Sequence, residues 1–264
     1  MNLQDDPFLS DLIARLDPPG DVGVAITGSY ARGENGEHSD LDLDIFVTKL
    51  PEETYTLRLL NGKLISVKYI LLADEYASLT KPEKAVWAVP GLRQMQIVQD
   101  ASGEIVKLKQ AALDFNWSNL QPAANEYAVG NLMKCAEEAH KIISGLKQNH
   151  ESKVLYASWG MFKELSFSVL VQAGLLIDSE DRAFDIIQKH LGLEHLWTEA
   201  FRLAFGMDTG DQNIPAYQTR GRAALKLYVQ TADLFKDIIN DAHREVIRYT
   251  LALIAENGKD LSHD

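Results

Sequence analysis

The sequence predicts an α+β protein, in which a mixed β-sheet with flanking helices is followed by an all-helical bundle. Residues 41–47, LDLDIFV, alternate apolar with polar side chains, which is the period of a β-strand. Asn61-Gly62, between two further strand-like runs, is a strong signal for a β-hairpin. From about residue 121 the apolar residues recur every three or four positions, as on the buried face of a helix. This change of period predicts two domains, residues 1–114 and 121–264.

The first domain is expected to contain short strands and helices in mixed order. A helical stripe ends at the breaker sequence Asp17-Pro-Pro-Gly20, and it consists of Phe8, Leu9, Leu12, Ile13 and Leu16. Strands are expected at residues 22–27, 41–47, 56–60, 63–70 and 93–99. Further helices are expected at residues 73–79, 82–88 and 104–115.

The second domain shows only helical periodicity. Apolar residues follow helical spacing over 128–146, and residues 154–176 are apolar nearly all round, which predicts a helix at the centre of the bundle. A shorter helix over 178–192 begins with an acidic turn and ends at Gly192. One long helix is expected to finish the chain, from about residue 222 to 256.

Composition and charge narrow the classes of function. The 264 residues carry a formal net charge of -12, which disfavours binding to duplex nucleic acid or to an anionic membrane and favours a small substrate. Cys135 is the only cysteine, so an intramolecular disulfide and a cysteine-based zinc site are excluded. No basic and apolar leader or membrane-spanning run is evident, so a cytoplasmic protein is expected. The sequence does not determine the oligomeric state, and a homodimer is possible.

The residues that indicate chemistry lie in the segment 28–47, GSYARGENGEHSDLDLDIFV. A strand ends at Gly28, where the lack of a side chain lets another group approach the backbone closely. Ser29 then opens a helix, so its hydroxyl and the free N–H groups of the first turn can hold an anion. The next strand carries acidic residues at every second position.

These acidic residues, Asp40, Asp42 and Asp44, share one face of the strand, because side chains two positions apart point the same way. The Cα atoms of Asp40 and Asp42 are expected to lie roughly 6.6 Å apart. Both carboxylates can then reach one hard cation, or a pair of them, with phosphate oxygens completing the shell. Three carboxylates on one face repel one another without a cation, which favours a bound metal over a solvated edge strand.

The spacing, Gly-Ser followed by ten residues and then Asp-x-Asp, resembles the polymerase-β-like nucleotidyltransferase superfamily. The longer pattern GSYARG…SDLDL is similar to its minimal and aminoglycoside-type bacterial members, and residues 96–110 are similar to the last strand and turn of that domain. The resemblance implies a metal-dependent enzyme that transfers a nucleoside monophosphate, with ATP as the expected donor, to a hydroxyl of a small acceptor such as an aminoglycoside. It assigns Asp40 and Asp42 to catalysis and to Mg²⁺ or Mn²⁺, and Gly28, Ser29 and Arg32 to the nucleotide.

The resemblance also implies a third acidic residue on the neighbouring strand, where this sequence has Ser66 and Lys68. Asp44, at a position that is usually apolar in the family, is a candidate for the missing carboxylate or for an ion pair with Lys68. Lys163 and Glu164 interrupt an otherwise apolar helix and are candidates for binding the triphosphate and activating the acceptor. The alternative interpretation is that Lys163 and Glu164 are surface residues that pair with one another.

The sequence is also compatible with a second class of function, a non-catalytic one. The absence of an acid at the expected strand position favours a non-catalytic nucleotide-binding module, or an antitoxin-like regulatory one. The intact Gly-Ser and Asp-x-Asp elements favour catalysis.

Overall fold

The computed structural model describes residue 12, residues 21–211 and residues 213–260. The chain divides into two compact units, residues 1–120 with 176–180, and residues 121–175 with 181–264. The first contains the sheet and the second is helical, so the predicted α+β class is confirmed. The helix expected over residues 8–16 lies outside the described residues, except for Leu12, which is buried.

The first unit is built on a five-stranded mixed sheet of order β3-β4-β2-β1-β5. Its strands are β1 (Asp21–Thr27), β2 (Leu41–Val47), β3 (Tyr55–Leu60), β4 (Lys63–Leu71) and β5 (Gln96–Asp100). β2 and β4 are parallel, and the other neighbours are antiparallel. The hairpin between β3 and β4 is confirmed at Asn61 and Gly62, whose φ angles of 51° and 76° are those of a tight turn that suits these two residue types.

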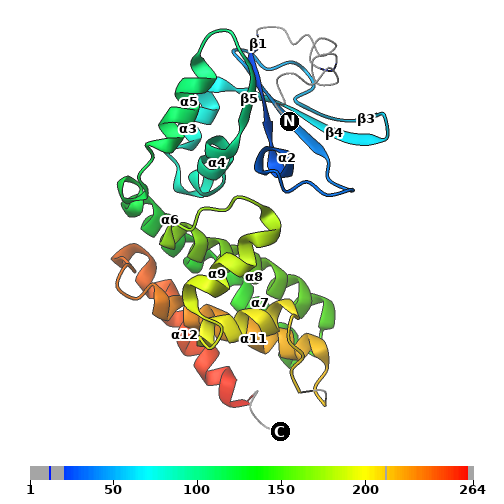
Figure 1. Cartoon of the computed structure of the whole chain (residues 1–264). Coiled ribbons are helices and arrows are strands. Elements are labelled where there is room, and N and C mark those ends of the chain that lie inside the picture. The colour runs from blue at the N-terminus through cyan, green and yellow to red at the C-terminus, as the bar shows by residue number, and fades with distance from the viewer. Residues whose placement is uncertain (1–11, 13–20, 212, 261–264) are drawn as a thin grey trace. The chain divides into compact units, whose positions relative to one another are not determined.

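The alternation of β2 gives the sheet two different faces. Leu43 and Ile45 pack on one face with residues of the neighbouring strands. Phe46 packs on the other with Ile105 and Leu108 of the last helix in this unit. The helices of the unit are α2 (Gly28–Arg32), α3 (Leu72–Ser78), α4 (Pro82–Gln94), α5 (Glu104–Leu113) and the short η2 (Trp117–Asn119). α3, α4 and α5 gather at one side, and the β3–β4 hairpin extends away from them (Figure 1).

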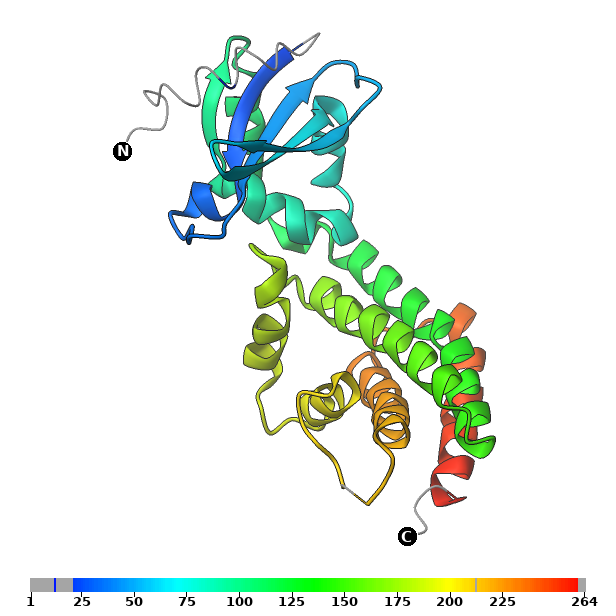
Figure 2. The same cartoon turned by 90° about the vertical axis from the view of Figure 1, so that its right-hand side faces the viewer.

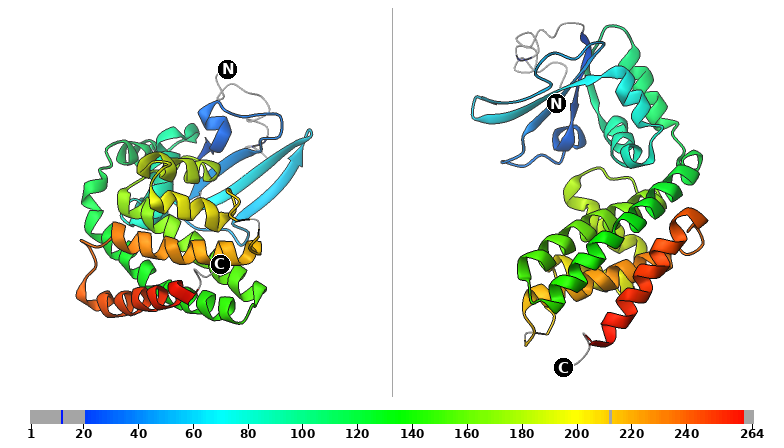
Figure 3. Two further views of the ribbon diagram at one scale, coloured as in Figure 1. Left: turned by 90° about the horizontal axis from the view of Figure 1, so that it is seen from below. Right: turned by 180° about the vertical axis from the view of Figure 1, so that it is seen from behind.

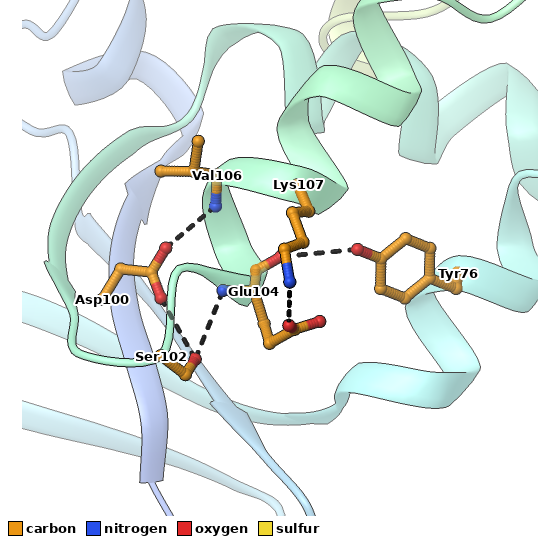
Figure 4. Close-up of polar contacts among 6 residues, drawn as sticks. All are labelled: Tyr76, Asp100, Ser102, Glu104, Val106 and Lys107. Atoms are coloured by element: carbon orange, nitrogen blue, oxygen red, sulfur yellow. Dashed lines mark hydrogen bonds and ion pairs between the residues drawn. The ribbon is translucent and has the colours of Figure 1, made fainter.

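The turn from β5 into α5 is fixed by side chains that accept hydrogen bonds from the first turn of the helix (Figure 4). The backbone N–H of Val106 donates to Asp100 Oδ2 over 2.9 Å, and that of Glu104 donates to Ser102 Oγ over 3.3 Å. Both satisfy donors that have no partner inside the helix. Tyr76 of α3 donates its hydroxyl to the carbonyl of Glu104 over 3.4 Å, which joins α3 to the same turn.

The second unit is a bundle arranged around one long helix. α8 (Glu151–Ala173) packs against five other helices, most extensively against α6, α7 and α11 (Figure 2). The remaining elements are α6 (Gln121–Lys134), α7 (Ala136–Lys147), η3 (Glu180–Arg182), α9 (Ala183–Leu191), α10 (Leu196–Phe205), α11 (Ala216–Leu234) and α12 (Asp241–Asp260). α12, drawn in orange to red, lies at the margin of this unit and contacts α6 and α7 (Figure 3).

One prediction for the helical part is wrong. The long helix expected over 222–256 is two helices, because the chain turns at the buried Phe235 and restarts where Asn240 accepts a hydrogen bond from the N–H of His243.

The predicted position of α8 at the centre of the bundle is confirmed. Two of its aromatic side chains, Tyr156 and Trp159, are nevertheless exposed by 71% and 57%.

An aromatic cluster holds the bundle together. Phe162 of α8 stacks on Phe201 and Phe205 of α10, with ring centroids 4.9 and 4.6 Å apart. Trp197 is fully buried, stacks on Phe201 and donates its indole N–H to Thr231 over 2.9 Å. Trp197 therefore combines a large buried area with a satisfied polar group.

Within the part of the chain that the structure describes, none of the helices has the length and apolar character that a membrane span requires.

One short segment leaves the bundle and packs in the first unit. α8 ends at Gly174, which has a φ of 65°, and the chain then runs through residues 176–180. Ile177 is buried there, and its N–H donates to the carbonyl of Val86 in α4 over 2.8 Å. Residues 176–180 therefore belong to the first unit and not to the predicted helical domain 121–264, because Ile177 is buried and hydrogen-bonded to α4.

Candidate active site

The turn after β1 brings the Gly-Ser element against the acidic strand. Gly28 begins α2 with a φ of 64°, a left-handed conformation that favours glycine. A Cβ atom at Gly28 would collide with the carboxylate of Asp42. The missing side chain at Gly28 therefore leaves the space that this carboxylate occupies.

Strand pairing sets the neighbours of the acidic side chains. β1 places Thr27 opposite Asp42, and Thr27 hydrogen-bonds the carboxylate of Asp44. Burial and the negative charge of Asp40 raise the pKa of Asp42, whereas a hydrogen bond from Ser66 and the charge of Arg32 lower it. Asp40 and Asp42 thus act on one another directly, as a shared cation site requires.

The neighbouring strand, β4, carries no acid beside these residues. Its parallel register places Ser66 opposite Asp42 and Lys68 opposite Asp44. Residues paired in this way share a face, so Lys68 lies on the face of the carboxylates. Its charge lowers the pKa of Asp44, but burial, the charge of Glu75 and the charge of Asp42 outweigh it and raise that pKa to about 7.

Glu75 is a member of this group that sequence reasoning missed. It lies on α3, which follows β4 without a loop. Burial raises the pKa of its carboxyl, and the charges of Lys68 and Lys84 lower it. No local motif marks Glu75, because only the return of α3 beside the sheet brings it near Asp44. Ser66 and Thr27 were also missed as partners of the carboxylates.

Arg32 is held in a fixed position beside the acidic group. Its Nε donates to Glu34 Oε2 over 2.8 Å, and one of its terminal nitrogens donates to the carbonyl of Asp178 over 3.0 Å. Only 13% of its side chain is exposed. The contact with Asp178 involves a residue 146 positions further along the chain, so no local pattern could have indicated it.

Exposed apolar side chains of β3 lie on the same face of the sheet as the acidic residues of β2. The antiparallel register of β3 and β4 places Tyr55 opposite Lys68 and Leu57 opposite Ser66. Leu59, two residues on, pairs with Leu64. Tyr55 and Leu57 are each 52% exposed and Leu59 is 74% exposed. The acidic face therefore continues into an accessible hydrophobic surface on the hairpin.

The two charged candidates of the helical unit have other surroundings. Lys163 and Glu164 are both exposed on α8, so they do not interrupt a buried face. The ammonium of Lys163 lies 5.8 Å from the centre of the Trp159 ring. The charge of Glu164 adds to burial in raising the pKa of the Cys135 thiol to about 12. Cys135 is therefore a protonated, buried side chain rather than a reactive thiolate.

The acidic face of β2 has oxygen atoms that suit a hard cation, although these side chains alone do not complete its coordination shell. No cluster of three or more His, Cys, Asp or Glu side chains that could hold a metal occurs among residue 12, residues 21–211 and residues 213–260. Asp40, Asp42 and the hydroxyl of Ser66 supply oxygen atoms of the type that Mg²⁺ prefers. Mg²⁺ commonly takes one or two carboxylates and completes its shell with phosphate and water. The residues present thus fit a metal that arrives with a triphosphate.

A Gly-Ser turn packed against paired carboxylates on a mixed sheet defines the class of nucleotidyltransferases. Residues 9–99 match the family model described as a nucleotidyltransferase domain. Residues 9–99 therefore resemble a polymerase-β-like nucleotidyltransferase domain, which supports a transferase activity in general. None of the curated proteins matches the chain. Among solved structures, it is similar to a nucleotidyltransferase-like protein from Exiguobacterium sibiricum 255-15, with a TM-score of 0.48 and 13% identity over 87% of this chain and 73% of that one.

The raised pKa of Asp44 predicts that stability falls as the pH rises. Between 3.8, its ordinary value, and about 7, the folded protein holds a proton on Asp44 that the unfolded chain has lost. The free energy of unfolding therefore decreases with pH across this window. Asp44→Asn removes this contribution, because an amide does not titrate. Thermal melting without metal or nucleotide should show a flatter pH dependence for the variant; an identical slope would contradict the assignment.

Gly28→Ala should impair the site more than a matched change at Gly33. Both glycines have a left-handed φ, 64° and 71°, so alanine costs about 1–2 kcal/mol at either position. Only at Gly28 does the added methyl group meet Asp42, and Gly33 faces open space. The melting temperature should fall in both variants and further in Gly28→Ala, where the collision adds to the backbone cost, and triphosphate binding measured by calorimetry should weaken only in Gly28→Ala. Equal losses of binding in both variants would refute the role of this contact.

Proposed function

We propose that the first unit binds a nucleoside triphosphate with Mg²⁺ or Mn²⁺ and transfers its nucleoside monophosphate to a hydroxyl of a small acceptor, with release of pyrophosphate. ATP is the proposed donor. The observation that carries the proposal is the packing of the Asp42 carboxylate against Gly28, which joins the Gly-Ser turn and the Asp-x-Asp strand in one site.

Gly28, Ser29 and Arg32 are the proposed nucleotide-binding residues. The turn at Gly28 exposes backbone close to the carboxylates, and Ser29 follows it with a hydroxyl. Arg32 contributes a positive charge that already acts on Asp42, which suits an anionic phosphate in the same place. Its hydrogen bonds to Glu34 and Asp178 hold the guanidinium in position before a ligand arrives.

Asp40 and Asp42 are the proposed metal ligands. When bound, the cation would offset the negative charge of the leaving pyrophosphate. The two acids would hold the cation, and Ser66 orients Asp42 through its hydrogen bond. Asp44 and Glu75 are the proposed additional carboxylates in place of an acid on β4, since both lie within electrostatic reach of Lys68.

Two features bear on the acceptor. The excess of carboxylates on this face suits a cationic molecule, which supports an aminoglycoside-like acceptor. The exposed Tyr55, Leu57 and Leu59 on the same face favour an acceptor that also has an apolar part.

A non-catalytic nucleotide-binding or antitoxin-like module is the second candidate. It is favoured by Ser66 and Lys68, which occupy the positions opposite Asp42 and Asp44 where the family places an acid. Release of pyrophosphate from a triphosphate across a panel of hydroxyl acceptors distinguishes the two functions, because only the enzyme turns over.

Asp42→Asn should remove most of the thermal stabilisation by a nucleoside triphosphate with Mg²⁺. A ligand that binds only the folded state stabilises it by mass action, by about 2.7 kcal/mol at a hundredfold excess over the dissociation constant. Asp114→Asn is the matched control, since Asp114 follows α5 and interacts with Gln110 rather than with the site. The shift in melting temperature should persist in the control. An equal shift in Asp42→Asn would remove Asp42 from the metal site.

A further inference from the structure

The helical unit contains a cavity that has no part in the site described above. It has a volume of about 700 Å³ and is lined by residues of α10 and α11, with Gly210, Asp211 and Ile214 from the connection between these helices. Ligand pockets commonly measure about 300–1,000 Å³, so the space suits a small organic molecule. Its walls are mainly apolar and include Leu203, Ile214 and Val229.

Arg222 of α11 lines this cavity and is incompletely satisfied. Its Nε is buried and has no hydrogen-bond partner among the described residues. The side chain of Arg222 is partly exposed, but its Nε is shut off from water. A buried N–H without an acceptor is destabilising, and more so when the group is charged, so the position of this nitrogen is unfavourable for the empty protein. An anion in the cavity would supply the missing acceptor.

A second cation reinforces this preference. Lys226 lies one helical turn after Arg222, lines the same cavity and forms no ion pair within the described part of the chain. Two carboxylates, Glu199 and Asp211, also line the cavity; both are exposed to water, and neither pairs with Arg222 or Lys226 in that part of the chain. Among these four charged residues, the Nε of Arg222 is the buried polar atom without a partner, so the lining favours an anion beside Arg222.

We infer that the cavity between α10 and α11 is a binding site for a small organic anion, in which Arg222 and Lys226 hold a carboxylate or phosphate group and the apolar walls enclose the body of the ligand. This site is independent of the proposed transferase function. It needs neither the metal nor the carboxylates of the first unit.

The first test uses the full chain and three probes of one shape: 1-naphthoate, 1-naphthyl phosphate and the neutral 1-naphthamide. Calorimetry should detect binding of at least one anion at millimolar concentration and markedly weaker binding of the amide. The two anions separate carboxylate from phosphate recognition. Arg222→Met should weaken anion binding by roughly tenfold to a hundredfold, which corresponds to loss of a charge-assisted hydrogen bond. Arg220→Met, on the same helix but outside the lining of this cavity, should leave it unchanged.

The second test needs no ligand. If Arg222 is retained for binding, Arg222→Met removes a buried, unsatisfied donor and should raise the melting temperature of the empty protein or leave it unchanged. A purely structural arginine would lower the melting temperature when replaced. The inference is overturned if neither anion binds, if the amide binds as tightly as the anions, or if Arg222→Met lowers stability while leaving anion binding intact.

Discussion

The contact between Gly28 and Asp42 determines the organisation of the first unit's polar site. β1 must be followed by a residue without a side chain, because the carboxylate of Asp42 occupies the space where a Cβ atom of Gly28 would be. The positive φ of Gly28 then directs the chain into α2, so Ser29 and Arg32 follow within one turn. Two sequence elements separated by ten residues thereby become one site, and the antiparallel pairing of β1 and β2 keeps them in register.

This arrangement concentrates negative charge that the surrounding residues only partly offset. Ser66, Thr27 and Arg32 act on Asp42 or Asp44 in the direction that favours the charged form, and Lys68 does so for Asp44 and Glu75. Burial outweighs these contributions for Asp42, Asp44 and Glu75. A site of this kind is poised to take up positive charge, which a metal bound with a triphosphate would provide.

The sequence pattern predicted those features of the fold that depend on residues close together in the chain. The alternation in β2 and the turn at Asn61-Gly62 are local properties, and both agree with the structure. Glu75 and the contact of Arg32 with Asp178 could not be predicted, since they arise when segments far apart in the chain, or on different elements, pack together. The break between α11 and α12 was missed because the intervening residues, from Phe235 to Asn240, contain neither proline nor glycine.

The central claim is that the Gly28 turn and the paired aspartates form a single site for a metal-bound triphosphate. A crystal structure of the full chain with a non-hydrolysable triphosphate and Mg²⁺ tests it most directly. The account predicts phosphate oxygens at Ser29 and a cation bound by carboxylate oxygens of both Asp40 and Asp42. A triphosphate bound elsewhere in the chain, or a cation that contacts neither aspartate, would contradict it.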